Sequence, residues 1–188
     1  MQAGRAAVFI RFVGCNMRCS MEAGPKSPGG FDCDTEFESG TFMSANAIRD
    51  SCLEESGHKG NQLIVLTGGE PGLQVDTELV DKLHRVGFFV QIETNGSVEV
   101  CPAVDWVTVS PKVAEHAIRQ KTADEVKYVR GYGQAIPKTA VNAKNKLISP
   151  ATNGLCVDRR TIAWCIDLVK KNPEWRLSVQ LHKDWGVR

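Results

Sequence analysis

Three cysteines stand close together near the start of the chain. The stretch at 14–37 reads "GCNMRCSMEAGPKSPGGFDCDTEF", with three residues between Cys15 and Cys19 and thirteen between Cys19 and Cys33. Thiolates are soft ligands that suit an iron–sulfur cluster, and a cluster held by only three of them keeps one iron open for another ligand. A zinc site would normally need a fourth Cys or His nearby, but His58 comes twenty-five residues after Cys33. From spacing alone, an iron–sulfur cluster, a zinc site and a metal-free loop all remain open.

The composition limits the classes of partner. The chain has 188 residues, of which 42% are hydrophobic, enough for one domain spanning 1–188. Its 23 basic and 22 acidic residues nearly cancel, which argues against a nucleic-acid groove or a membrane surface. The apolar runs are far shorter than the roughly 18 residues of a membrane span, and no secretory pattern opens the chain. We therefore expect a cytoplasmic protein whose substrate recognition rests on a few placed charges.

The other cysteines are not expected to bind a metal. The chain has seven cysteines, an odd number, and in a reducing cytosol clustered thiols more often serve metals or redox chemistry than disulfides. Four lie outside the cluster, and we expect them to be small, partly buried side chains. These four are Cys52, Cys101, Cys156 and Cys165.

Short apolar segments that alternate with helical patterns must position these residues. The predicted strands are 7–13, 63–67, 88–94, 105–110, 125–130, 145–149 and 176–181. The apolar spacing predicts helices after a cap at Ser44, over 77–86 and over 158–171. Near-continuous apolar strands between amphipathic helices are typical of a parallel sheet. The predicted class is α/β, most simply an open or partial β/α barrel.

The unusual residues follow the predicted strands directly. "GCN" comes after the first strand, "GGEP" after the second, "TNG" after the third, "SPK" after the fourth and "SP" after the sixth. In a parallel α/β fold the loops after the strands converge on a ligand at one edge of the sheet. The scattered motifs therefore predict a single site.

Together these motifs resemble those of a known family. With "MEAGPKSPGGF" removed, the cysteine stretch reads "GCNMRCSDCDTEF", which is similar to the C-x3-C-x2-C loop of radical S-adenosylmethionine (SAM) enzymes. The segments "RFVGCN…CDT", "LTGGEPGLQ", "IETNGS", "VSPK" and "SVQLHK" occur in the order found in the 7-carboxy-7-deazaguanine synthase (QueE) family of queuosine biosynthesis. The resemblance covers nearly the whole chain, from about Gly4 to Arg188.

The resemblance implies a carbon–nitrogen lyase of the radical SAM class. A [4Fe–4S] cluster on Cys15, Cys19 and Cys33 would reduce SAM, and the resulting 5′-deoxyadenosyl radical would act on 6-carboxy-5,6,7,8-tetrahydropterin. The pterin ring would contract to 7-carboxy-7-deazaguanine with loss of ammonia, while the protein positions and shields the cofactors. The family also implies Mg²⁺, an electron donor such as flavodoxin or ferredoxin, and a homodimer.

The resemblance also assigns residues to each ligand. Contacts with SAM are implied for Gly68, Gly69, Glu70, Asn95, Ser110, Pro111, Lys112 and Ser149. Glu70 would offer its carboxylate to the SAM ammonium group. Substrate contacts are implied for Arg11, Thr67, Glu93, His182 and Arg188. The guanidinium of Arg11 suits a carboxylate, which it can bind through two parallel hydrogen bonds. Thr35 matches the Mg²⁺ position, with water and substrate oxygens completing the shell.

The sequence departs from the family in two places. The chain begins after the family's usual first strand and its "Q-G-E-G" segment, so we expect either a sequence that is truncated or starts at an internal methionine, or a protein that binds substrate with fewer contacts. Asp32 stands where the family often has an aromatic residue near the adenine of SAM, and Phe31 is one step earlier. Either residue could meet the adenine. Asp34 could support the Mg²⁺ site without binding the ion itself, or it could cap a helix or turn.

Two other functions are compatible with part of the pattern. A radical SAM activase would use the same cysteines to make a glycyl radical on a partner protein, but "CDT", "SPK" and "QLHK" favour the lyase. A non-catalytic interaction module stapled by zinc would explain the cysteines alone. The content of iron, sulfide and zinc distinguishes the zinc module from both enzymes.

Overall fold

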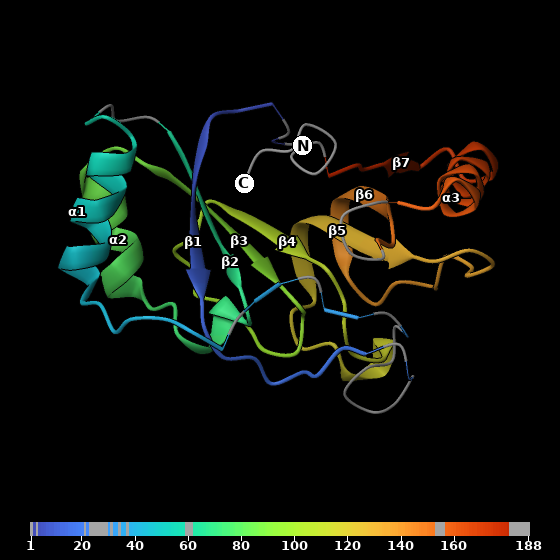
Figure 1. Cartoon of the computed structure of the whole chain (residues 1–188), viewed down its shortest axis with the longest axis horizontal. Coiled ribbons are helices and arrows are strands. Elements are labelled where there is room, and N and C mark those ends of the chain that lie inside the picture. Colours follow the sequence, from blue (N-terminus) through green and yellow to red (C-terminus); the bar gives the residue numbers. More distant parts are fainter. Residues whose placement is uncertain are drawn as a thin grey trace.

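In the part of the chain that the structure describes, seven parallel strands form one sheet whose order follows the sequence (Figure 1). The computed structural model describes residues 2, 4–20, 22, 30, 32–33, 35–36, 38–58, 62–152 and 157–180. The strands are β1 (Ala7–Phe12), β2 (Leu63–Gly68), β3 (Phe89–Thr94), β4 (Trp106–Val109), β5 (Thr122–Arg130), β6 (Asn142–Pro150) and β7 (Trp175–Leu177). Among the described residues no ladder joins β1 to β7, so the sheet is open. The predicted α/β class with a partial parallel barrel is confirmed.

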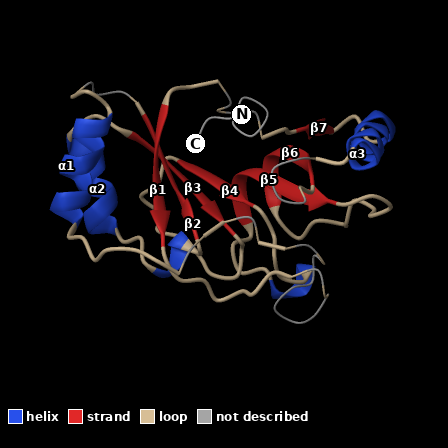
Figure 2. Ribbon diagram, in the orientation of Figure 1, coloured by secondary structure: helices blue, strands red, loops and turns tan. Residues whose placement is uncertain are grey.

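Within the described residues, three α-helices and two 3₁₀ turns accompany the sheet. The α-helices are α1 (Ala45–Glu55), α2 (Thr77–Arg85) and α3 (Arg159–Lys171), and the 3₁₀ turns are η1 (Pro71–Leu73) and η2 (Glu115–Ala117). Helices α1 and α2 pack together at the β1 end of the sheet, while α3 lies beside β6 and β7 at the other end (Figures 1 and 2). All three predicted helices are confirmed. No helix in the described ranges has the length and apolar character needed to cross a membrane.

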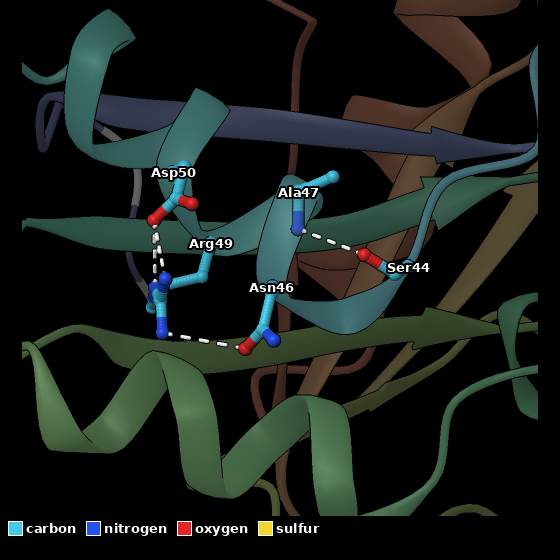
Figure 3. Close-up of polar contacts among 5 residues, drawn as sticks. All are labelled: Ser44, Asn46, Ala47, Arg49 and Asp50. Atoms are coloured by element: carbon cyan, nitrogen blue, oxygen red, sulfur yellow. Dashed lines mark hydrogen bonds and ion pairs between the residues drawn. The ribbon is translucent and has the colours of Figure 1, made fainter.

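Each α-helix begins at a side chain that caps its first turn. The Ser44 hydroxyl accepts a hydrogen bond of 3.2 Å from the backbone N–H of Ala47 at the start of α1 (Figure 3). Within α1, the guanidinium of Arg49 donates to the carboxylate of Asp50 (Figure 3). An aspartate caps each of the other two helices: Asp76 for α2 and Asp158 for α3. The caps fix where each helix starts, and thus how long a loop remains after the preceding strand.

The helix-covered face of the sheet forms the apolar core. Ile64 and Leu66 of β2 and Val90 and Ile92 of β3 are buried against α1 and α2, together with Leu83 of α2. A second cluster lies under α3 and contains Val109, Val126, Tyr128, Ile148, Cys165 and Trp175. Alternate residues of each strand belong to this core, as a period of two requires, although all four positions of β2 from Leu63 to Leu66 are buried. The intervening residues consequently point to the opposite, inner face.

The inner face is polar across its central strands. Gln91 of β3 donates from Nε2 to the Thr108 hydroxyl of β4 (3.4 Å), and that hydroxyl donates to Oε1 of Glu125 on β5 (3.4 Å). Lys127 of β5 forms an ion pair with Glu93 of β3, with 3.1 Å between Nζ and Oε1. This pair joins β3 to β5 across β4 on the inner face of the partial barrel, which is its concave side.

Some predicted boundaries needed correction. Strands β5 and β6 begin earlier than predicted, because Thr122 and Asn142 already pair in the ladder although both are polar. Strand β7 is shorter than predicted and its ladder ends at Leu177 opposite Ile148. Only three of the six connections contain an α-helix; the described loops after β3, β4 and β5 do not. Without a covering helix, these loops are available to shape the edge of the sheet.

Candidate functional site

The loops that carry the predicted site residues meet at the edge to which the strands point. Parallel pairing places the ends of neighbouring strands together, with Arg11 opposite Thr67 and Thr94 opposite Val109. Figures 1 and 2 show the loop after β1 running along this edge, beyond the arrowheads of β1 to β4, where η1 and η2 also lie. The convergence expected from the sequence is therefore present in the fold.

The third cysteine of the loop, Cys33, lies beside the second, Cys19. The backbone N–H of Cys33 donates to the carbonyl oxygen of Cys19 (3.4 Å) in spite of the thirteen intervening residues. Cys15 and Cys19 are half-buried, and Cys33 is exposed. Within the described ranges, no three His, Cys, Asp or Glu side chains gather closely enough to hold a single metal ion. The three thiols are thus not arranged for a mononuclear site.

The environment of Cys15 acts on its thiol in both directions. Burial raises its pKa, and the negative charges of Glu70 and Cys33 raise it further. Two hydrogen bonds oppose this shift, because the backbone N–H of Met17 (3.4 Å) and the side-chain N–H of Asn95 (3.8 Å) donate to the sulfur. The site therefore holds donors that favour a negatively charged sulfur at Cys15.

Three of the other cysteines belong to the packing. Cys52 of α1 and Cys165 of α3 are buried, and burial raises the pKa of each thiol to about 11. Cys101 is half-buried, with its sulfur 3.7 Å from the Thr77 hydroxyl. The packing role expected for Cys52 and Cys165 is confirmed, while Cys156 lies outside the described residues.

Two glycines allow the turn after β2 to lie against the loop after β1. A Cβ atom at Gly68 would collide with the backbone of Phe12, and one at Gly69 would collide with the carbonyl of Gly14. Gly68 also has a φ of +108°, a conformation that favours glycine. The N–H of Gly69 donates to Phe12 O (2.8 Å), and that of Glu70 donates to Gly14 O (2.9 Å). The turn thereby braces the residue that precedes the first cysteine.

The Glu70 carboxylate is buried completely and serves the fold. Its Oε1 accepts hydrogen bonds from the Thr94 hydroxyl (2.7 Å) and the Gly72 N–H (2.8 Å), and its Oε2 accepts one from the Asn95 N–H (2.7 Å). The side chain is 0% exposed, and burial raises its pKa in spite of the three donors. Glu70 therefore joins the turn after β2 to the turn after β3, and a ligand's ammonium group would have to compete with these donors.

The loops after β3 and β4 are joined through backbone bonds. Ser110 N–H donates to Thr94 O (2.8 Å), and Lys112 N–H donates to Asn95 O (3.1 Å). The Lys112 ammonium donates to the Ser110 hydroxyl (3.3 Å), with Pro111 between them. Ser149 is buried at the end of β6, opposite Val129 of β5. The predicted "SPK" segment thus lies directly against the "TNG" turn.

Three of the five predicted substrate residues occupy one row of the inner face. Arg11 is exposed on β1 and is the ladder partner of the half-buried Thr67 on β2. Glu93 on β3 is half-buried and is held by Lys127. The positions face the concave side of the sheet just below its edge. Asp32 is exposed and Thr35 is half-buried, whereas Phe31, Asp34, His182 and Arg188 lie outside the described residues.

Sequence reasoning missed three residues that the structure brings to this edge. Lys127 holds Glu93, Thr94 holds Glu70, and Asn16 accepts a hydrogen bond from Asn95. Thr94 and Asn16 lie inside the "TNG" and "GCN" motifs, so their positions were available from the sequence. Lys127 was harder to predict, since the alternation of side chains along β5 places it on the inner face but does not predict its ion pair with Glu93.

Comparison with known proteins gives a consistent result. The chain is 38% identical over 194 residues to the "7-carboxy-7-deazaguanine synthase" of Bradyrhizobium diazoefficiens, covering 99% of this chain and 91% of the relative. It is 37% identical over 185 residues to the protein of that name from Bacteroides thetaiotaomicron, covering 98% and 90%. No family model matches the chain.

A solved structure has a similar fold. It is described as "Crystal structure of QueE from Escherichia coli", with a TM-score of 0.61 and 25% sequence identity. The match covers 94% of this chain and 86% of the other. The similarity therefore extends over the sheet and the loops that form the candidate site.

Proposed function

The chain belongs to the 7-carboxy-7-deazaguanine synthase family, and from this premise we propose how the edge of its sheet supports that family's reaction. The chain is a radical SAM lyase that converts 6-carboxy-5,6,7,8-tetrahydropterin to 7-carboxy-7-deazaguanine with loss of ammonia. One observation carries the proposal for the site: Asn95, at the end of β3, hydrogen-bonds to both Cys15 and Asn16 after β1. This joins the cysteine loop to the loops that we assign to SAM.

Cys15, Cys19 and Cys33 fit a [4Fe–4S] cluster better than a single zinc ion. The backbone of Cys33 returns to that of Cys19, and the charge of Cys33 acts on Cys15. A cluster takes each thiolate on a different iron, so it does not require them to converge on one point. When bound, the cluster and SAM supply the one-electron and hydrogen-abstraction chemistry. The chain supplies the thiolates and the braced loops around them.

The SAM-binding role falls to the loops after β2, β3, β4 and β6. Gly68 and Gly69 let this turn lie against the backbone of Phe12 and Gly14, and Glu70 holds the turn to Asn95. The remaining SAM residues that we propose are Ser110, Pro111, Lys112 and Ser149, with Phe31, Asp32 and Asp34 near the third cysteine. Because Glu70 is enclosed by three donors, we assign the ligand contact of its turn to the backbone.

The substrate role falls to the inner face beside these loops. Arg11 offers a guanidinium to the pterin carboxylate, and Thr67 and Glu93 offer groups for the polar edge of the ring. His182 and Arg188 complete the proposed substrate residues. Thr35, two residues after Cys33, is the proposed protein ligand of Mg²⁺, an ion that usually keeps several waters and few protein ligands.

The partners follow from the same chemistry. Reduction of the cluster needs a one-electron donor, which we propose to be a flavodoxin or ferredoxin. A homodimer and a cytoplasmic location are further proposals; the latter fits clustered cysteines that serve a metal cluster as reduced thiolates. A glycyl-radical activase and a zinc-stapled module are not favoured, because the relatives of this chain carry the synthase name over nearly its whole length.

Anaerobic reconstitution tests the assignment of the cluster. The wild-type chain should bind about four irons and four sulfides without zinc, and dithionite should bleach its visible absorbance. Addition of SAM to the reduced protein should change the electron paramagnetic resonance spectrum, because the open iron gains ligands. Cys33→Ser should lose this spectrum, while Cys101→Ser, a matched change outside the loop, should keep it. Zinc in place of iron, or equal loss in both variants, would contradict the assignment.

A further inference from the structure

The side-chain amide of Asn95 is directed at the sulfur of Cys15. Asn95 Nδ2 lies 3.8 Å from Cys15 Sγ and 3.0 Å from Asn16 Oδ1, so its two hydrogens have two acceptors on the cysteine loop. The residue is 7% exposed, which keeps water from competing strongly for these hydrogens. Among the described contacts of Cys15 Sγ, Asn95 provides the side-chain donor and Met17 provides the backbone donor.

The orientation of this amide is determined by its neighbours. Asn95 Oδ1 accepts a hydrogen bond of 2.8 Å from the backbone N–H of Ser97, so the amide nitrogen must occupy the other position. Asn16 is fixed in turn, because its Nδ2 donates to the Ser97 hydroxyl (2.8 Å) and its oxygen is left for Asn95. The backbone N–H of Ser97 therefore determines that the amide N–H of Asn95, and not its oxygen, points to the sulfur.

The backbone of Asn95 is held as firmly as its side chain. Its N–H donates to the buried Glu70 carboxylate (2.7 Å), and its carbonyl accepts from Lys112 N–H (3.1 Å). Glu70 is itself held by Thr94 and Gly72. A donor fixed in advance at a charged group stabilises that group without a cost of reorganisation.

We propose that Asn95 raises the reduction potential of the cluster by donating an N–H···S hydrogen bond to the Cys15 ligand. The inference rests on the proposed function, because it needs a cluster on Cys15. Hydrogen bonds to cluster sulfurs are among the factors that determine the potential. Reduction adds one electron and therefore one negative charge, shared by the sulfurs, and the N–H dipole stabilises the reduced form more than the oxidised form. The electron comes from an external one-electron reductant, and no covalent bond forms or breaks.

Asn95→Leu tests the proposal, since it keeps the approximate size and removes the donor. The midpoint potential is measured by anaerobic titration with dithionite, followed by electron paramagnetic resonance. We expect the equilibrium constant for reduction to fall about tenfold, a shift of about 59 mV to lower potential for one electron. Ser97→Ala is the control, because it removes a hydroxyl from the same network but keeps the backbone N–H that orients Asn95. Its potential should equal that of the wild type.

A second variant guards against a failure to fold or to load iron. Asn95→Asp keeps an oxygen for the Ser97 N–H and replaces the donor with a second oxygen, so its potential should also fall. Iron content reports separately on the proposed function: a wild type that binds no iron refutes the cluster, and with it the inference. If the wild type binds four irons but an iron-loaded Asn95 variant has the same midpoint potential as the wild type, the inference is overturned and the proposed function is not. The same holds if Ser97→Ala lowers the potential as much as Asn95→Leu.

Discussion

Glu70 shows how a motif residue can serve a site without facing it. The carboxylate lies under the edge of the sheet and receives three donors from two different turns. Its partners include the backbone of Asn95, whose side chain reaches the first cysteine. A change at Glu70 should therefore alter both the stability of the fold and the geometry of the cysteine loop.

Glu70→Gln should remove a pH-dependent part of the stability. Burial raises the pKa of Glu70 above its ordinary value of 4.5, so the folded protein holds this proton more tightly than the unfolded chain does. The stability due to that proton is fully present below pH 4.5 and is lost as the pH rises through the folded pKa. The unfolding free energy of the wild type minus that of Glu70→Gln should therefore decrease over this range.

Urea denaturation between pH 4 and 8, roughly the range in which this carboxyl can titrate, provides the measurement. At neutral pH the variant should also lose about 1–3 kcal/mol, because one of the three buried donors must face an amide N–H. Glu78→Gln is the control, since it removes the same charge from an exposed position on α2. A difference between wild type and Glu70→Gln that does not change with pH would contradict this account.

At the level of residues, the sequence was informative where types and spacing were distinctive. The cysteines, the two glycines after β2 and the "TNG" turn were all recognisable before the fold was known. The contacts between them were not, because a hydrogen bond such as that from Asn95 to Cys15 joins positions eighty residues apart. Burial of the Glu70 carboxylate was likewise invisible, since a glutamate after two glycines reads equally well as exposed.

The elements meet most closely where the turn after β2 crosses the end of β1. The backbone bonds from Gly69 and Glu70 to Phe12 and Gly14 continue the ladder beyond the two strands. There is no space for a side chain at Gly69, because a Cβ atom would overlap the Gly14 carbonyl. The position of Cys15 therefore depends on a glycine fifty-four residues later.

Gly69→Ala should separate these two loops. Overpacking against a backbone atom typically costs about 1–3 kcal/mol, and here it should also displace Cys15, so that less iron is bound per chain. The measurement pairs thermal unfolding with iron analysis after reconstitution. Gly131→Ala is the control, because its added Cβ would meet only ordinary contacts at 3.7 Å with Gln134. Wild-type stability and iron content in Gly69→Ala would show that the close approach is not needed.

Strand and helix positions were largely predictable because their patterns are local. Apolar runs located the seven strands that the structure describes, and apolar spacing located its three α-helices, with Ser44 predicted as the cap of the first. The early starts of β5 and β6 were missed, since polar residues such as Thr122 and Asn142 enter a strand only because a neighbour pairs with them. Pairing of that kind is a tertiary effect that a local pattern does not contain.

At the scale of the whole molecule, the open sheet places one ion pair on its concave face. Lys127 and Glu93 come from strands that flank β4, and both side chains are only partly exposed, at 20% and 32%. Glu125 is buried on the same face. Lys127 is therefore a cation between acidic side chains, close to the row where we place a carboxylated substrate.

Lys127→Met should weaken binding of the pterin. Loss of the cation leaves the Glu93 carboxylate without its ion pair, and a nearby anionic substrate should then bind about tenfold more weakly, which is about 1.4 kcal/mol. Calorimetry with 6-carboxy-5,6,7,8-tetrahydropterin, without reductant, measures the dissociation constant directly. Lys144→Met removes the same charge from an exposed position on β6 and should leave the constant unchanged. Equal affinities for Lys127→Met and the wild type would remove Lys127 from the site.

The central claim is that this chain contracts a carboxylated pterin by using three cysteines and SAM at the edge of an open parallel sheet. The most direct measurement is anaerobic incubation of the reconstituted protein with SAM, dithionite, Mg²⁺ and 6-carboxy-5,6,7,8-tetrahydropterin, followed by mass spectrometry. The account predicts 7-carboxy-7-deazaguanine and released ammonia, both absent from the Cys33→Ser protein. If a protein with its full iron content yields neither 5′-deoxyadenosine nor the deazaguanine product, the account is contradicted.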